Sequence, residues 1–187
     1  MITADGSLHH FYVSYSDHPK TQVYRISERL TCARFDGRRT DIEYEIATDR
    51  ILNHRSSGQI GQAKGFRMTF AVRGIYVHED MLFLRVFLRN KSSIKYDIQS
   101  LRFFVRDKKN LRRTASQEVE LRPLYVRNET KSISGNGSAD VVFVFQKFTI
   151  PDSKTLNIEL FERDGGRNLK LHVGNHSIIK AVRLPIN

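Results

Sequence analysis

The chain has 187 residues, of which 40% are hydrophobic and 27% charged, and it contains a single cysteine. This length and apolar content suit one good-sized domain whose hydrophobic core is large enough to be stable without disulfides or structural metals. A lone cysteine excludes an intramolecular disulfide. The net charge of +11 favours partners that carry negative charge, namely nucleic acid, anionic membrane surfaces or acidic proteins.

The amino-terminal residues predict an interrupted β-hairpin. Asp5-Gly6 is a hairpin-turn dipeptide, and residues 9–15 alternate like a strand, but only four residues precede the turn. We therefore expect the chain to begin partway through a larger protein. On this interpretation residues 1–39 are the remnant of an upstream β-domain followed by a linker. The first residues do not have the pattern of a signal peptide.

A helix is predicted over residues 41–54. Thr40 and Glu43 have the spacing of a capping box, and apolar residues recur near helical spacing through the segment. The small and polar residues that follow, up to Gly58 and Gly61, are expected to end the helix.

From residue 66 onward the hydrophobic period changes to two, which predicts a succession of strands. We expect strands over residues 66–72, 75–77, 82–89, 94–105, 119–126, 141–148, 156–160, 169–173 and 177–184, with a loop over 131–138. Strands that recur every ~8–12 residues are typical of a sandwich or a barrel. The predicted fold is all-β, an immunoglobulin-like β-sandwich with one short helix before it, in a domain of residues 40–187.

Three details of the strand pattern predict a central strand, a bulge and an edge strand. The strand over 82–89 is partly apolar on both faces, which is typical of a central strand. The alternation changes parity near Gln99-Ser100, which indicates a bulge or a break. Pro123 indicates that the strand over 119–126 lies at a sheet edge, because proline cannot donate a ladder hydrogen bond.

Motifs that would indicate an enzyme or a cofactor site are incomplete. Two Ser-x-x-Lys pairs, beginning at Ser92 and Ser177, lack a convincing helix and the companion motifs of acyl-serine enzymes. Cys32 lies among turn residues, and His172 and His176 have no evident third metal ligand. No apolar run approaches the ~18 residues of a membrane span. We expect no catalytic, cofactor or metal site and no membrane-spanning segment.

The strongest constellation is a cationic turn that follows the strand over 94–105. Its cations are Arg102, Arg106, Lys108, Lys109, Arg112 and Arg113. Arg102 and Arg106 share parity with Phe104, so one face combines aromatic and basic groups. Such a turn can bind phosphates or an acidic protein surface, and it can equally be a solvated hairpin tip. The candidate partner-binding residues, called the basic turn below, are Arg106, Lys108, Lys109, Arg112 and Arg113.

A family resemblance covers most of the chain. Residues 74–98 read GIYVHEDMLFLRVFLRNKSSIKYDI, and this run resembles the C-terminal domain of the TraN family of Bacteroidetes conjugative transposons. Residues 102–118, RFFVRDKKNLRRTASQE, and residues 123–126, PLYV, resemble the family too. Residues 3–15 are similar to the end of the domain that precedes it in the family.

The resemblance implies a role without catalysis in conjugative DNA transfer. TraN proteins are similar to the β-sandwich component of the outer-membrane core complex of type IV secretion systems. The implied partners are a lipoprotein and a membrane-spanning core protein, within a large oligomer in the periplasm or at the outer membrane of a Gram-negative bacterium. No cofactor is implied. The alternative is a basic nucleic-acid-binding β-module, which the charge and the Arg–Phe interleaving favour.

Overall fold

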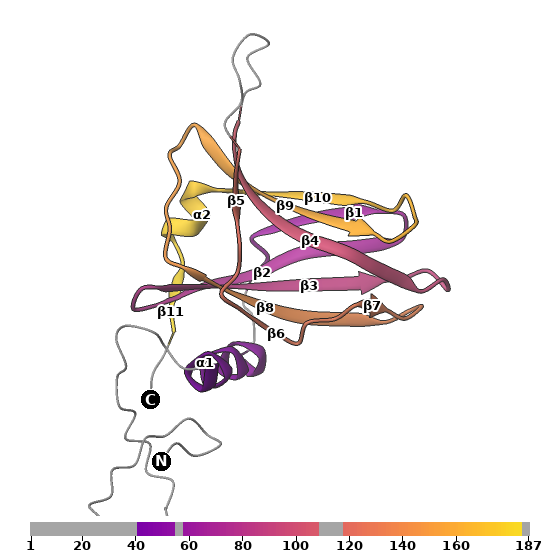
Figure 1. The fold of residues 1–187 in the computed structure, drawn as a ribbon, viewed down its shortest axis with the longest axis horizontal. Helices are drawn as coiled ribbons and strands as arrows, with labels where there is room; N and C mark the ends of the chain where they lie inside the picture. The colour runs from indigo at the N-terminus through magenta and orange to yellow at the C-terminus, as the bar shows by residue number, and fades with distance from the viewer. Residues whose placement is uncertain (1–40, 55–57, 109–117, 185–187) are drawn as a thin grey trace, which may run out of the picture. The chain divides into compact units, whose positions relative to one another are not determined.

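The computed structural model describes residues 41–54, 58–108 and 118–184. The contacts divide the chain into two units, Met1–Tyr44 and Glu45–Asn187, and the second holds all the strands described below. Two β-sheets pack face to face in this unit (Figure 1). The predicted all-β class is therefore confirmed. Among the described residues, no helix is long and apolar enough to span a membrane.

The helices are α1 (Asp41–Asn53) and α2 (Asn175–Ile179). The strands are β1 (Gly61–Gly65), β2 (Met68–His78), β3 (Met81–Asn90), β4 (Tyr96–Asp107), β5 (Val119–Leu121), β6 (Tyr125–Arg127), β7 (Ser132–Ile133), β8 (Ser138–Gln146), β9 (Lys154–Glu162), β10 (Leu169–Gly174) and β11 (Val182–Arg183). The six-stranded sheet has the order β1-β2-β3-β8-β6, with β11 parallel to β2. The five-stranded sheet has the order β10-β9-β4-β5, with β7 paired to β4.

The core lies between the two sheets, and phenylalanine rings join them at its centre. Phe103 on β4 makes edge-to-face contacts with Phe143 and Phe145 on β8, each at a centroid distance of 4.9 Å. A bulge between Val72 and Gly74 changes the parity of β2, so that both Val72 and Ile75 face this core. Strand β3 lies between β2 and β8, which confirms its predicted central position.

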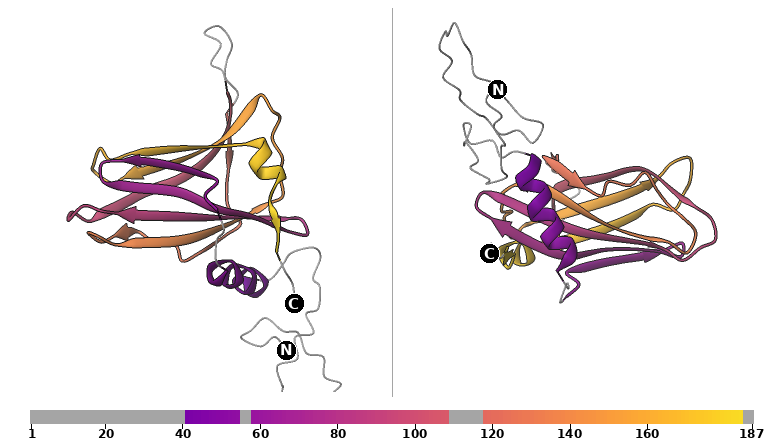
Figure 2. Two further views of the ribbon diagram at one scale, coloured as in Figure 1. Left: turned by 180° about the vertical axis from the view of Figure 1, so that it is seen from behind. Right: turned by 90° about the horizontal axis from the view of Figure 1, so that it is seen from below.

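Helix α1 does not merely precede the sandwich, because its part from Glu45 onward contacts the outer face of the six-stranded sheet (Figure 2). Ile51 is fully buried. Arg85, which points outward from the middle of β3, donates hydrogen bonds to the carbonyl oxygens of Ile51 and His54 at 3.0 and 2.9 Å. Arg127 on β6 pairs with Asp49. The predicted helix is thus confirmed and forms a third, partial layer.

The prediction that a strand begins at Phe66 was wrong. Phe66 and Arg67 form the two-residue turn of the β1–β2 hairpin, with φ angles of 52° and 60°, and the strand begins at Met68. Gly61, expected to end the helix, instead begins β1. The alternation of Phe66 with Met68 and Phe70 gave no sign of the turn, since neither turn residue is one that turns favour.

Other boundaries also differ from the prediction. The segment 119–126 is two strands rather than one, since Pro123 stands where the chain leaves β5 in one sheet for β6 in the other. Both are edge strands, as the proline predicted. The expected loop over 131–138 contains β7, and the expected strand over 177–184 is α2 followed by β11. The bulge near Gln99 is confirmed by a register shift between Ile98 and Ser100. Residues 1–39 lie outside the described residues.

Candidate partner-binding surface

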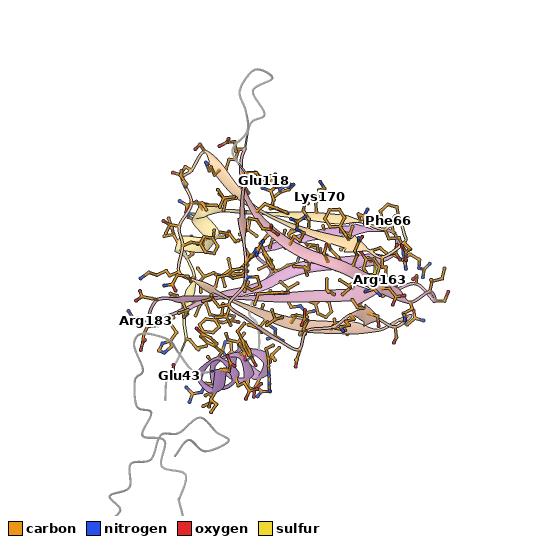
Figure 3. All side chains as sticks on the ribbon, viewed as in Figure 1. Glu43, Phe66, Glu118, Arg163, Lys170 and Arg183 are labelled. Carbon is orange, nitrogen blue, oxygen red and sulfur yellow. The ribbon has the colours of Figure 1, made fainter. Side chains whose placement is uncertain are left out.

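The outer face of the five-stranded sheet carries the basic and aromatic residues that the sequence placed together. Strand alternation turns Arg102, Phe104 and Arg106 away from Phe103, whose side chain enters the core. In the sheet register Arg102 lies opposite Glu159 of β9, and Phe104 lies opposite Glu120 of β5. Figure 3 labels Glu118 and Lys170, which belong to the same face.

Both arginines of this face are paired with carboxylates. Arg102 donates two hydrogen bonds to Glu120, at 2.9 and 3.0 Å. Arg106 contacts Glu118 through Nε at 2.6 Å and Glu159 through a terminal nitrogen at 2.5 Å. Lys170 on β10 reaches the same oxygen of Glu159 at 3.0 Å. The network therefore joins β10, β9, β4 and β5 across the width of the sheet.

Phe104 is buried beneath this network although it lies on an outer face. The guanidinium carbons of Arg102 and Arg106 lie 4.8 and 4.4 Å from its ring centroid, and only 4% of the residue is exposed. Cations over an aromatic face are attracted by its quadrupole, and here they also exclude water from the ring. The aromatic group is consequently not free to stack on a nucleobase in this conformation.

The charges of the network reinforce one another. The hydrogen bonds that Arg106 donates to Glu118 and Glu159 raise the pKa of Arg106, and the bond that Arg102 donates to Glu120 raises the pKa of Arg102. Burial by itself would raise the pKa of Glu159, but hydrogen bonds from Arg106 and Lys170 outweigh it and lower the pKa of this carboxyl. Each of these groups therefore keeps its charge at neutral pH.

The structure places only part of the basic turn. Arg106 belongs to the paired network, whereas Lys108 is exposed and its backbone N–H donates to the carbonyl of Ser153 at 2.8 Å. Lys109, Arg112 and Arg113 lie outside the described residues. The sequence reasoning missed Glu118, Glu120 and Glu159 as partners, because two of them reach β4 only through strand pairing with β5 and β9.

A second feature of β4 is a gap along its edge. On the side away from β9, β7 pairs with Tyr96 and Asp97, and β5 pairs with residues 103–105. Within the part of the chain that the structure describes, residues 99–102 have no strand on that side. An edge strand with unpaired backbone groups is a template for another strand.

A cavity of about 360 Å³ opens at this gap. Its floor includes Leu88, Val141 and Phe143 from the six-stranded sheet, and its rim is polar, with Glu129, Lys131 and Arg163. The backbone of Ile98 is held at one end by a bond from its N–H to the carbonyl of Lys131, at 2.9 Å. The arrangement can accept one short extended segment with an apolar side chain turned inward. The parity change at Gln99-Ser100 was the sequence signal for this place.

The histidines considered as metal ligands in the sequence lie on different elements. Among the residues the structure describes, no three His, Cys, Asp or Glu side chains are grouped closely enough to hold a metal ion. His172 lies on β10 and His176 on α2. Cys32 lies outside the described residues.

Comparison with protein families gives a match over most of the chain. Residues 40–183 match the model of a domain of unknown function, DUF4138. The chain belongs to this family. The match spans the whole of the sandwich described above, including the gap in β4, the paired network and α2. A search among curated proteins gives no significant match.

Proposed function

We propose that this protein is a non-catalytic structural component of a conjugative DNA-transfer channel of the type IV secretion kind. It acts by protein–protein assembly in the cell envelope, in the periplasm or beside the outer membrane. The resemblance of residues 74–98 and 102–118 to the TraN family supports the conjugative role. Membership of the DUF4138 family is compatible with this role and assigns no function of its own.

The observation that carries the assembly role is the gap in β4 together with the cavity beside it. Strand addition uses main-chain hydrogen bonds for affinity and a pocket for an alternate side chain for specificity. Residues 99–102 offer the backbone edge, and Leu88, Val141 and Phe143 offer the apolar floor. The partner we propose is an extended segment of another envelope transfer protein.

The basic turn favours an acidic partner for this docking. Lys108 stands exposed at the end of β4, and the sequence adds Lys109, Arg112 and Arg113 directly after it. Surface charges of one sign speed encounter with an acidic partner and discriminate against basic ones. The guanidinium of Arg106 already bridges two carboxylates, Glu118 and Glu159.

The same pairing bears on the nucleic-acid-binding alternative. Phosphates would have to displace Glu118, Glu120 and Glu159 to reach Arg102 and Arg106. The alternative then rests on the overall charge of +11 rather than on the Arg–Phe face. Titration with single-stranded DNA at two salt concentrations separates the two functions, because phosphate binding weakens steeply with salt.

Photo-crosslinking in conjugating cells tests the assembly role. A photoreactive amino acid replaces Gln99, which is exposed at the gap, and in a matched strain it replaces Gln146, which is exposed at the end of β8. We expect position 99 to capture another envelope transfer protein and position 146 to capture much less. Equal yields at both positions would place the partner elsewhere on the molecule.

Charge reversal tests the basic turn separately. Exchange of Lys109, Arg112 and Arg113 for Glu should leave the fold intact and reduce DNA transfer at least tenfold, because it turns the attraction of an acidic partner into repulsion. If transfer is unchanged, the turn is a solvated tip. If deletion of the whole protein leaves transfer unchanged, the proposed function itself is wrong.

A further inference from the structure

The turn of the β1–β2 hairpin is built from residues that do not suit its geometry. Gly65 pairs with Met68, so Phe66 and Arg67 alone form the loop. Their φ angles of 52° and 60° put both in the left-handed region, the pattern of a type I′ turn. Asn-Gly is favoured at these positions because the left-handed region costs an ordinary side chain roughly 1–2 kcal/mol.

Folding therefore gives no reason for a phenylalanine at this place. The ring makes no contribution to the core, since 59% of the residue is exposed. A bulky residue in a left-handed conformation at an exposed tip is an outlier of the kind that accompanies a binding role. Figure 3 labels Phe66 at one end of the sandwich, where the hairpin tips lie.

A second apolar side chain protrudes from the neighbouring tip. Ile94, in the connection between β3 and β4, is 70% exposed. The two tips are joined, because the backbone N–H of Lys91 donates to the carbonyl of Arg67 at 2.8 Å and Arg67 Nε donates to the carbonyl of Lys91 at 3.0 Å. Phe66 and Ile94 thus stand on a shared, fixed platform.

Four exposed cations lie on the same strands and tips as the two apolar side chains. Lys64 and Arg89 flank Thr69 in the sheet register, and Arg67 and Lys91 lie on the tips themselves. Within the described ranges, none of these four cations forms an ion pair. This differs from the outer face of the five-stranded sheet, where Arg102 and Arg106 are neutralised by glutamates.

We propose that this end of the sandwich binds the surface of an anionic lipid bilayer. Phe66 and Ile94 enter the boundary between headgroups and acyl chains, while Lys64, Arg67, Arg89 and Lys91 contact lipid phosphates. Apolar side chains on protruding tips, together with exposed cations on the same tips and strands that form no ion pair with any described residue, match a membrane interface, whose apolar layer lies beneath a negative surface. A nucleic acid has no apolar layer to receive Ile94, and an apolar protein groove gives four unpaired cations no counter-charge.

Sedimentation with lipid vesicles tests the proposal. The purified protein is mixed with vesicles of phosphatidylcholine alone or with one-third phosphatidylglycerol. We expect binding to the anionic vesicles and at least tenfold weaker binding to the neutral ones. The variant F66N/R67G should lose at least tenfold in affinity for anionic vesicles, because it removes the aromatic anchor and one cation.

The same variant has a second readout that guards against misfolding. Because Asn-Gly suits the turn, F66N/R67G should raise Tm by about 3–8 °C while its affinity for anionic vesicles falls at least tenfold. The matched control is V182N/R183Q, which removes an exposed valine and an arginine from β11, the strand paired with the opposite end of β2. This control should bind vesicles like the wild type.

Three results would overturn the proposal. The first is equal affinity of F66N/R67G and the wild type for anionic vesicles, and the second is absence of any preference for phosphatidylglycerol. The third is a wild-type protein that binds single-stranded DNA but no vesicles, together with loss of that DNA binding in F66N/R67G. The last would assign the tips to nucleic acid. None of these outcomes depends on a conjugation partner, so the channel role can fail while the lipid surface stands, and the reverse.

Discussion

Asn90 shows how one buried polar side chain can organise an end of the sandwich. It is fully buried at the end of β3, and its Nδ2 donates to the carbonyls of Ile94, Ser134 and Ile133 at 2.7, 3.2 and 3.3 Å. Its Oδ1 accepts from both the backbone N–H and the hydroxyl of Ser92. One amide therefore ties the β3–β4 tip to the segment before β8.

Replacement of Asn90 by Asp should destabilise the domain by about 2–5 kcal/mol. The carboxylate keeps the acceptor for Ser92 but faces carbonyl oxygens it can no longer donate to, and it buries a charge without a partner. Chemical denaturation gives the free energy of unfolding. Ser92→Ala, which removes one hydroxyl, should cost about 0.5–1.5 kcal/mol. A loss below 0.5 kcal/mol for Asn90→Asp would mean that the amide network is not what holds this end.

At the scale of elements, α1 is fixed to the sandwich by a charged side chain that is itself buried. Arg85 is 8% exposed and satisfies Asp140 through Nε at 3.0 Å, besides the two helix carbonyls. The last carbonyls of a helix lack intrahelical donors and carry partial negative charge. Arg85 on β3 thus supplies the hydrogen-bond donors that the carbonyls at the end of α1 lack within the helix.

Arg85→Met should cost about 1–3 kcal/mol, because the carbonyls of Ile51 and His54 lose their buried donor and Asp140 is left with Arg73 alone among the described residues. Hydrogen exchange should show the loss first in the amides of residues 45–53. The matched control is Arg89→Met on the same strand, whose exposed side chain forms no ion pair with any described residue, and which should change stability by no more than about 0.5 kcal/mol. Similar effects of the two variants would contradict the anchoring role of Arg85.

The elements that the sequence predicted correctly are those in which the local pattern of apolar and polar side chains matches the buried and exposed faces. Strand β3, the hairpin of β9 and β10 and the bulge at Gln99 follow from local alternation. The β1–β2 hairpin was hidden because Phe66-Arg67 is not turn chemistry, and α2 because five residues carry too little helical period. The partners of Arg102 and Arg106 lay beyond reach, since pairing of distant strands decides which carboxylates stand beside them.

For the whole molecule, the balance of charge makes stability dependent on pH. Hydrogen bonds from arginines lower the pKa of Glu120 and of Glu162, and the pKa of Glu159 is lowered by Arg106 and Lys170 against the effect of burial. A carboxyl whose folded pKa lies below its unfolded value stabilises the fold fully only above the unfolded pKa, near 4.3 for glutamate. That stabilisation is lost as pH falls through the lower, folded values.

Acid titration of stability follows from this balance. We expect the free energy of unfolding to fall steadily below about pH 4.5, as proton uptake breaks the carboxylate pairs and leaves a chain of +11 net charge still more positive. Glu159→Gln should lower stability at pH 7 by about 1–3 kcal/mol and flatten the acid dependence. Exposed Glu129, exchanged for Gln, is the control and should leave the curve unchanged. A Glu159→Gln curve parallel to the wild type would remove Glu159 from this account.

Two strands, β1 and β11, pair with the same edge of β2, and they become available at different times during synthesis. The first half of that edge pairs with β1, which lies directly before it in the chain, whereas Tyr76 and Val77 pair with Val182 and Arg183, more than a hundred residues later. A ribosome that makes some 5–20 residues each second therefore leaves this half of the edge bare for several seconds. Contacts of such separation are slow to close. During every round of synthesis the molecule passes through a state in which the six-stranded sheet is open on one side.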